Sequence, residues 1–425
     1  MSKRQRPLIP ADDPFYALPT DFEHDVPGAI IKTRPVEIGF LGVVPQAVDA
    51  TQMLYHSTAM NGEPTIAVTT VVRGKGRAVS AHVLSYQCAI DAIDSTQFPS
   101  YEFQRGSRFV VSVPRLEYLL VAAAVRRGWT VSIPDHEGLQ GNWGVAREPG
   151  YHILDGVRAI LNDEAATDSA IPVGLWGYSG GGLASSWAAE MAAEYAPELN
   201  VIGAVLGSPV GDPGETLRRL NGTVFAGLPV LVIAALTRNY PEVRSLIDVH
   251  GTDRGKQELE RAAGMSTMQA IGAFARHEIS EFTDLTMPQI LADPRLQTVL
   301  DDIRLGGRAP AMPVLVTQSV NDPVISVDDV TAQVDRYREK GADVTFLRDR
   351  LSEHILLHPL AAPHSIAWLD DRCEAGLPGT AQPGETTTVW SIALSRVWLA
   401  NVVELLLVVV LVVCGRDLRR SKRPQ

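Results

Sequence analysis

A serine flanked by glycines, Gly177-Tyr178-Ser179-Gly180-Gly181, is the segment of this chain whose residue types and spacing best suit chemistry. Residues 171–176 before it predict a short buried strand, and residues 183–195 after it predict an alanine-rich helix. A sharp turn from strand to helix strains the backbone of its central serine and exposes the hydroxyl as a nucleophile. The glycines are then required because side chains there would collide across the turn. The alternative is a structural turn with a passive serine.

A serine hydroxyl needs a base to take its proton and an acid to orient that base. After a serine in this setting, the acid comes next along the chain and the base last. Asp322 follows the predicted strand 313–318, in the loop at its carboxyl end. Asp328 and Asp329 compete with it, but they open the next predicted helix and are typical of first-turn acids. We therefore predict that Asp322 is the acid; its alternative role is only to form the turn before a proline.

Three histidines follow the last clear predicted strand, residues 344–346, and any of them could be the base. They are His354, His358 and His364. A histidine after a strand is often only a polar surface residue. Spacing alone leaves the choice among the three open.

A tetrahedral oxyanion needs two hydrogen-bond donors. The backbone N–H of Gly180, directly after the serine, is one of them by the geometry of the motif. A glycine-rich partner loop is missing, and the corresponding loop, residues 86–91, ends at Asp91. Asp91 can contribute its backbone N–H, or its carboxyl group if burial keeps that group protonated. Its alternative is to be an ordinary solvated loop carboxylate.

Short apolar runs alternate with helical patterns around these residues, and this alternation predicts an α/β fold with a mostly parallel sheet covered on both faces. The predicted strands are residues 78–87, 129–134, 173–176, 201–206, 313–318 and 344–346. The predicted helices are residues 115–127, 150–161, 183–195 and 327–340.

The alternation stops between residues 212 and 308, where the pattern is helical and predicts a cap inserted over the sheet. Within it, residues 226–236 are almost wholly apolar and either line an acyl site or form a buried cap helix. Residues 376–388 are rich in Gly, Pro and Thr and predict a linker. The resulting division is a core in two parts, 1–211 and 311–376, a cap at 212–310, a linker at 377–391 and a C-terminal segment at 392–425.

Composition narrows the classes of function. The chain has 425 residues, 45% of them hydrophobic, which is ample for a large core. Its net charge of -11 argues against a nucleic-acid partner. Three widely separated cysteines form neither a metal-spaced cluster nor a disulfide framework.

The C-terminal segment is unusual. Residues 397–414 are apolar except for Asn401 and Glu404, and five basic residues follow at once. This length is close to the roughly 20 residues of a membrane helix, and an off-centre acid still permits insertion. The alternative is a core helix docked on the main domain. No apolar stretch of a classical signal peptide follows the basic residues 1–6.

With these pieces in place, most of the chain, from about residue 13 to 376, closely resembles the secretory lipase family typified by fungal lipase A. The matching segments are Asp13-Pro14-Phe15-Tyr16, Pro134-Asp135-His136-Glu137-Gly138, Ile153-Leu154-Asp155-Gly156-Val157-Arg158, the serine motif, and Tyr195-Ala196-Pro197-Glu198-Leu199-Asn200. The resemblance implies an α/β-hydrolase fold, with Ser179 as nucleophile, Asp322 as acid, His354 as base and Asp91 in the oxyanion hole. Phe98 stands where relatives often have a cysteine, so a cap-tethering disulfide is not expected.

The expected function is therefore hydrolysis of lipid carboxylic esters, most plainly triacylglycerols, through an acyl-enzyme and without cofactor or metal. The alternatives are a carboxylesterase or acyltransferase acting on a cell-envelope lipid, and an inactive lipid-binding protein tethered to a membrane. The expected partners are a lipid ester and, through the C-terminal helix, a membrane; the oligomeric state is left open. The catalytic domain is expected outside the cytoplasm, or the protein is secreted.

Overall fold

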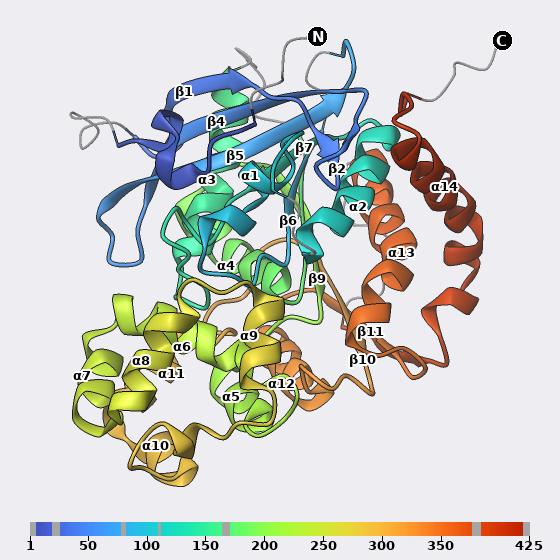
Figure 1. Cartoon of the computed structure of the whole chain (residues 1–425). Helices are drawn as coiled ribbons and strands as arrows, with labels where there is room; N and C mark the ends of the chain where they lie inside the picture. The colour runs from blue at the N-terminus through green and yellow to red at the C-terminus, as the bar shows by residue number, and fades with distance from the viewer. Residues whose placement is uncertain are drawn as a thin grey trace, which may run out of the picture.

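A single large sheet forms the centre of the molecule. The computed structural model describes residues 6–18, 26–77, 82–108, 112–163, 171–375 and 384–419. The strand order of the sheet is β1-β4-β5-β7-β6-β8-β9-β10-β11-β12 (Figure 1). The strands are β1 Ile30–Pro35, β4 Val48–Thr58, β5 Pro64–Gly74, β6 Val83–Gln87, β7 Thr130–Pro134, β8 Val173–Tyr178, β9 Val201–Gly207, β10 Val314–Ser319, β11 Val344–Asp349 and β12 Thr386–Val389, with a separate small hairpin of β2 Gly39–Phe40 and β3 Val44–Pro45.

The sheet is parallel where the predicted strands lie and antiparallel at its N-terminal side. From β7 to β12 every neighbouring pair is parallel, whereas β1, β4, β5 and β7 pair antiparallel. The parallel strands β6, β7 and β8 are buried along their whole length, which explains their uninterrupted apolar sequences. The long hairpin of β4 and β5 was absent from the sequence prediction, and residues 78–81 of the predicted strand 78–87 lie outside the described residues.

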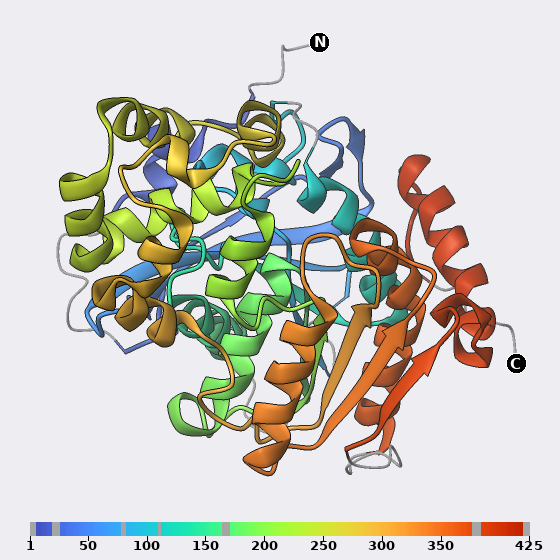
Figure 2. The same cartoon turned by 90° about the horizontal axis from the view of Figure 1, so that it is seen from below.

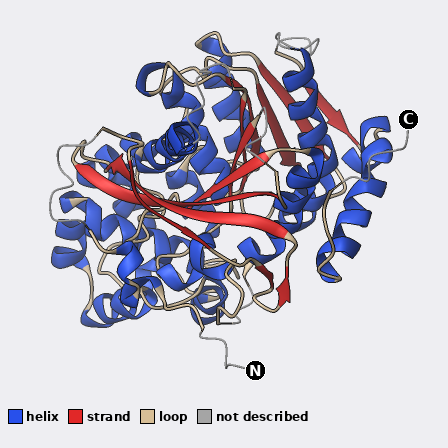
Figure 3. Ribbon diagram, turned by 90° about the horizontal axis from the view of Figure 1, so that it is seen from above, coloured by secondary structure: helices blue, strands red, loops and turns tan. Residues whose placement is uncertain are grey.

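Helices cover both faces of the sheet, as two-sided apolar strands require (Figures 2 and 3). One face packs against α3 Glu148–Asp163, α4 Gly180–Tyr195 and α12 Val327–Glu339. The other packs against α2 Val113–Arg127 and α13 His354–Ala375. The short helices are α1 Pro99–Glu102 and the 3-10 turns η1 Pro10–Asp12, η2 Pro14–Tyr16, η4 Ser95–Gln97, η5 Ile279–Glu281 and η6 Ile392–Leu394.

All elements between β9 and β10 are helical, so the predicted cap is present. In Figure 1 it forms the yellow-green and yellow lobe below the carboxyl ends of the strands. Its helices are α5 Pro213–Leu220, α6 Gly227–Asn239, α7 Pro241–His250, α8 Asp253–Ala262, α9 Thr267–Phe274, α10 Met287–Ala292 and α11 Pro294–Ile303. The fold is thus the expected α/β-hydrolase core with an inserted helical cap.

The predicted linker is wrong over part of its length. Residues 376–383 lie outside the described residues, but Thr386–Val389 form β12, which pairs in parallel with β11. Three consecutive threonines and a valine favour a strand because their β-branched side chains suit an extended backbone. The Gly- and Pro-rich composition of the neighbouring residues concealed this signal.

The C-terminal apolar segment is a helix, α14 Arg396–Val413, that packs on α2 and α13 at the side of the molecule (Figure 1). Its mean hydropathy is 2.3, and by length and composition it is the one helix in the described residues suited to cross a membrane. Only 11% of these 18 residues are buried inside the protein. The helix is therefore docked, as one alternative predicted, but several of its large apolar side chains are exposed.

Candidate active site

The serine motif forms the predicted sharp turn between β8 and α4. Ser179 has φ 54° and ψ -119°, a backbone conformation that L-residues rarely adopt. A Cβ on Gly177 would overlap the carbonyl oxygen of Gly181, and one on Gly181 would overlap that of Gln87. Both glycines are therefore required by close approach of the backbone, which places the serine side chain at the carboxyl end of the central strand.

Ser179, His354 and Asp322 come together in one hydrogen-bonded chain. His354 Nε2 lies 3.0 Å from Ser179 Oγ, and His354 Nδ1 lies 2.7 Å from Asp322 Oδ2. An ionised carboxylate can only accept, so the proton of the neutral imidazole is on Nδ1 and the lone pair of Nε2 faces the hydroxyl. This is the arrangement in which a histidine can take the serine proton.

The carboxylate of Asp322 is held from several sides. Its Oδ1 accepts from the backbone N–H groups of Val324 and Ile325, both at 2.8 Å. Its Oδ2 also accepts from Gln318 Nε2 at 3.2 Å. The turn-forming role and the orienting role, which sequence reasoning treated as alternatives, are therefore combined in one side chain. Asp328 and Asp329 lie instead in the first turn of α12.

The three candidate histidines now differ clearly. His354 begins α13, and its carbonyl oxygen accepts from Tyr178 Oη at 2.5 Å. His358, one turn further on, is buried against Tyr178 with ring centroids 4.3 Å apart and lies 3.2 Å from Tyr86 Oη. Burial lowers the pKa of His358 to about 3, so it stays neutral. Of the three, only His354 contacts the serine and the acid.

Asp91 lies against the serine turn, as the resemblance implied. Its φ is 48°, again a strained value, and a Cβ on Gly180 would overlap its Oδ1. Asp91 Oδ1 is buried without a hydrogen-bond partner. Burial raises the pKa of this carboxyl group to about 7, with nearby His354 acting in the opposite direction. A buried carboxyl group with one unpartnered oxygen, beside the first N–H of α4, is suited to donate a hydrogen bond to an anion when it is protonated.

Two residues that sequence reasoning missed border this position. Glu117 on α2 accepts the backbone N–H of Ala89 at 2.9 Å and so holds the loop that carries Asp91. Trp143 lines the same cavity as Ser179, and its Nε1 would lie 3.3 Å from a Cβ on Gly180. Neither belongs to a local motif, since each reaches the site from a distant part of the chain.

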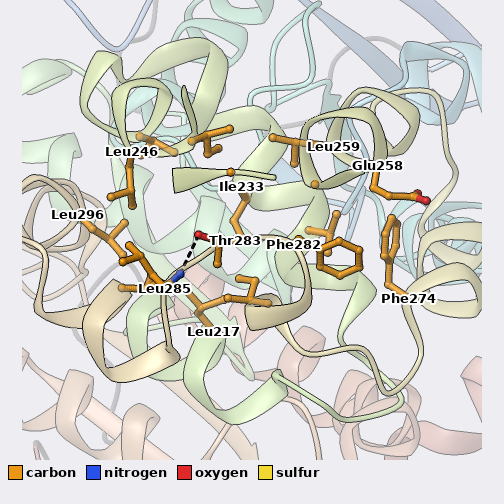
Figure 4. A pocket seen from close by; sticks show the side chains of 17 residues that line it. Leu217, Ile233, Leu246, Glu258, Leu259, Phe274, Phe282, Thr283, Leu285 and Leu296 are labelled. Carbon is orange, nitrogen blue, oxygen red and sulfur yellow. Dashed lines mark hydrogen bonds between the residues drawn. The ribbon is translucent and has the colours of Figure 1, made fainter. Parts of the chain in front are cut away.

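One apolar cavity begins at the serine, and a second lies in the cap next to it. The first is lined by Ser179, Gly180 and Asp91 and by apolar residues of α5, α6 and α11. The second lies within the cap, and the side chains drawn in Figure 4 converge on it. Leu217, Ile233, Val243 and Leu296 line both cavities. The cavity beside the serine has a volume of about 100 Å³, and the second has a volume of about 130 Å³.

The predicted apolar segment 226–236 contributes to this lining. It lies mostly in α6, and Leu228, Val232 and Leu236 line the cavity beside the serine. Polar groups are few in the second cavity: only Glu258 and Thr283 among its lining residues carry polar side chains. The space beyond the serine is therefore suited to a hydrocarbon chain rather than to a sugar or a peptide.

The secretory lipase family model matches residues 103–380, which is more than half of the chain. The chain belongs to the secretory lipase family. Lipase A of Arthroderma benhamiae is 34% identical to this chain, over 87% of the chain and 80% of that protein. A Mycobacterium tuberculosis protein named "Probable inactive lipase" is 47% identical, over 100% of the chain and 95% of that protein.

Among solved structures, the chain is similar to Candida antarctica lipase A. The TM-score is 0.84 at 24% sequence identity, and the match covers 94% of the chain and 95% of that structure. At this identity the likeness shows the fold. The α/β-hydrolase assignment made from the sequence is confirmed by this likeness.

Proposed function

We propose that this protein is a serine hydrolase of lipid carboxylic esters, and specifically a triacylglycerol lipase that forms an acyl-enzyme on Ser179. The observation that supports it most is the hydrogen-bonded chain of Asp322, His354 and Ser179 opening on apolar cavities. A serine nucleophile with its base can attack the carbonyl carbon of any ester, so this part of the site does not define the substrate. The apolar cavities select esters with long acyl chains.

The reaction proceeds in two halves. Ser179 Oγ attacks the ester carbonyl carbon while His354 Nε2 takes its proton, and the imidazolium then gives that proton to the departing alcohol. Water next attacks the acyl-enzyme, with His354 as base, and releases the fatty acid and free Ser179. Asp322 keeps the ring in the required tautomer and stabilises its charged form. Every step balances without metal or cofactor.

The oxyanion in each half is bound by the N–H of Gly180 and by Asp91. Gly180 is the first residue of α4, and the first N–H groups of a helix have no partner within it. The positive end of the helix dipole adds to this attraction. Asp91 supplies the second hydrogen bond through its protonated carboxyl group.

Replacing Asp91 tests this assignment through pH. The protonated carboxyl group donates, whereas ionisation removes the donor and adds a negative charge beside the oxyanion. With a pKa of about 7, wild-type turnover should fall as pH rises from 7 to 9. Asp91→Asn donates at every pH, so its turnover relative to wild type should rise over this range. Asp91→Ala should lose on the order of 100-fold in turnover at pH 6.

The control for this series is the Michaelis constant, which an oxyanion donor should change much less than turnover. A constant ratio of Asp91→Asn to wild type between pH 6 and 9 would show that only the backbone of Asp91 contributes.

Chain-length preference tests the substrate class. Ile233 lies between the two cavities, so Ile233→Trp should block passage of a long chain into the second one. We expect activity on long-chain triacylglycerols to fall about tenfold or more while activity on tributyrin stays within about threefold. Val249→Trp, on an exposed position of α7, is the matched control. Equal losses on both substrates would argue for a short-chain carboxylesterase, and product formation with an added alcohol would reveal acyl transfer.

The name of the mycobacterial relative raises the alternative of an inactive lipid-binding protein. In this chain, the contacts between His354, Ser179 and Asp322 favour activity. Covalent labelling of the serine by a fluorophosphonate distinguishes the two possibilities, because the reagent requires an activated nucleophile.

Association with a membrane is part of the proposal. The length and apolarity of α14 support it, and the basic residues after it agree with lipid headgroups nearby. The secretory character of the family favours the outer side of the membrane for the catalytic domain, or release from the cell.

A further inference from the structure

One line of apolar side chains runs along the outer face of α14. Its members follow a spacing of four, three, four and three residues, so they lie on one side of the helix. We call them the outer stripe: Leu399 (59% exposed), Val403 (70%), Leu406 (60%), Val410 (58%) and Val413 (53%). A helix on the surface of a water-soluble domain normally presents polar residues at these positions. A continuous exposed apolar line instead marks an interaction surface.

The two polar residues in the middle of α14, Asn401 and Glu404, face the domain. Glu404 pairs with Arg127 Nη2 at 3.1 Å and with Arg126 at 3.6 Å, and Asn401 Oδ1 accepts from Arg127 Nη2 at 2.6 Å. Near the other end, Gln46 Nε2 donates to the carbonyl oxygen of Val412 at 3.0 Å. These contacts fix the rotation of the helix about its axis, so that the outer stripe points away from the protein.

The apolar surface continues from α14 to the catalytic histidine. The exposed residues of this second part, the entrance patch, are Leu351 (67%), Ile355 (68%), Leu356 (55%), Trp390 (65%) and Leu394 (71%). Leu351 donates its backbone N–H to the carbonyl oxygen of Trp390 at 3.1 Å, which ties the loop before His354 to the segment that leads into α14. The segment that leads into α14 is thus joined to the loop before His354, and Ile355 of the entrance patch directly follows that histidine.

Basic residues accompany this surface although the whole chain carries a net charge of -11. Arg396 and Arg416 are exposed at the two ends of α14. Arg419 is also exposed and pairs with Asp417. Arg420, Lys422 and Arg423 follow in the sequence, outside the described residues. Cations at both ends of an apolar stripe complement an anionic lipid surface. If the stripe instead packed against the same stripe of a second copy, these basic residues would face one another and repel.

We propose that α14 lies in the plane of an anionic membrane surface, with the outer stripe in the boundary between headgroups and acyl chains and its inner face still docked on α2. The entrance patch touches the same surface, so the His354 end of the site is held at the lipid. This deepens the membrane association proposed above and does not depend on hydrolysis, because Ser179→Ala should bind equally well.

A membrane-spanning α14 would need a different structure. The helix would have to leave α2, which would separate Glu404 and Asn401 from Arg127 and carry the acid into hydrocarbon. The in-plane arrangement keeps all of these contacts and buries only side chains that are already exposed. The structure therefore favours lying on the membrane over crossing it.

Vesicle binding tests the outer stripe. Full-length protein is mixed with vesicles of phosphatidylglycerol and phosphatidylcholine, or of phosphatidylcholine alone, and the bound fraction is measured by co-sedimentation. Val403→Asn/Leu406→Asn/Val410→Asn should weaken binding to the anionic vesicles about tenfold or more. The matched control, Val26→Asn/Leu18→Asn/Val249→Asn, changes the same residue types at 70%, 59% and 64% exposure on other surfaces and should bind within about twofold of wild type.

Both triple variants should keep the wild-type unfolding temperature and tributyrin activity, since the changed side chains are exposed and distant from the triad. The proposal would be overturned if the wild-type protein did not bind anionic vesicles, or if the stripe variant bound them as well as the wild type. A wild-type dimer in solution that the stripe variant abolishes would also overturn it, because the stripe would then be an interface between copies.

Thiol labelling distinguishes an α14 that lies in the plane of the membrane from one that crosses it. Cys414, at the end of α14, is exposed, and Cys373→Ser leaves it as the accessible thiol because Cys88 is buried. On vesicles, Cys414 of the in-plane helix should react fully with a membrane-impermeant maleimide added outside. Protection of Cys414 until the vesicles are dissolved in detergent would show a spanning helix and contradict the proposal.

Discussion

Replacing Ser179 with alanine should abolish ester hydrolysis and leave the fold intact. The hydroxyl is the one group in the site with a base at 3.0 Å, so no other residue can replace it. Loss of a triad serine typically costs on the order of a million-fold in turnover. Alanine retains the Cβ and meets the same backbone strain, so the thermal unfolding temperature should change little. Turnover on tributyrin and on a long-chain triacylglycerol is the measurement.

The matched control is Ser245→Ala, on an exposed position of α7. It should keep full activity, which excludes a general effect of serine removal. Residual turnover within tenfold of wild type in Ser179→Ala would remove Ser179 from the mechanism.

Replacing His354 with alanine should be about as damaging as removing the serine. The two residues act as one unit, because a hydroxyl without its base is not a nucleophile at neutral pH. The double variant Ser179→Ala/His354→Ala should therefore be no worse than either single variant. Single-turnover and steady-state rates of the three variants are the measurement.

Two nearby histidines provide the controls for this experiment. His364→Ala should leave turnover near wild type, since the structure gives His364 no contact with the triad. His358→Ala should mainly lower the unfolding temperature, because its ring packs on Tyr178 in the core. If His358→Ala were the inactive variant and His354→Ala the active one, the assignment of the base would be wrong.

Local sequence patterns were enough to single out Ser179 as the candidate nucleophile and Asp322 as the candidate acid. The strand, the glycine-flanked Ser179 and the helix are consecutive, so backbone sterics alone determine how the hydroxyl is presented. Asp322 follows a buried strand directly, which determines the edge of the sheet at which it lies. His354 required the family resemblance, because three histidines lie on one helix and only tertiary packing distinguishes them.

Other features depended on contacts that no local pattern reports. The helix α13 contains Pro359 and Pro363, which argue against a continuous helix in the sequence. The hairpin of β4 and β5 is buried by neighbours that come later in the chain, so it lacks the simple alternation of a half-exposed strand. Glu404 was seen in the sequence only as a cost for membrane insertion; its partners on α2 are more than 270 residues earlier in the chain.

The site therefore combines one turn that is specified locally with several contacts from residues that are distant in the sequence. The turn at Ser179 is specified by its own five residues. By contrast, the position of Asp91 depends on a loop whose backbone is hydrogen-bonded to Glu117 on α2. The unpartnered Oδ1 of Asp91 suggests a role only because the fold places it next to Gly180. This is why spacing alone singled out Ser179 and Gly180, whereas it left open whether Asp91 acts through its backbone or its side chain.

The most direct test of the central claim is the mass of the protein after reaction with a slowly deacylating long-chain ester. Intact mass spectrometry should show the addition of one acyl group, and peptide mapping should locate that group on Ser179. Asp91→Asn should still acquire the label, whereas Ser179→Ala should not. An unmodified protein, or an acyl group on any other residue, would contradict the proposed acyl-enzyme.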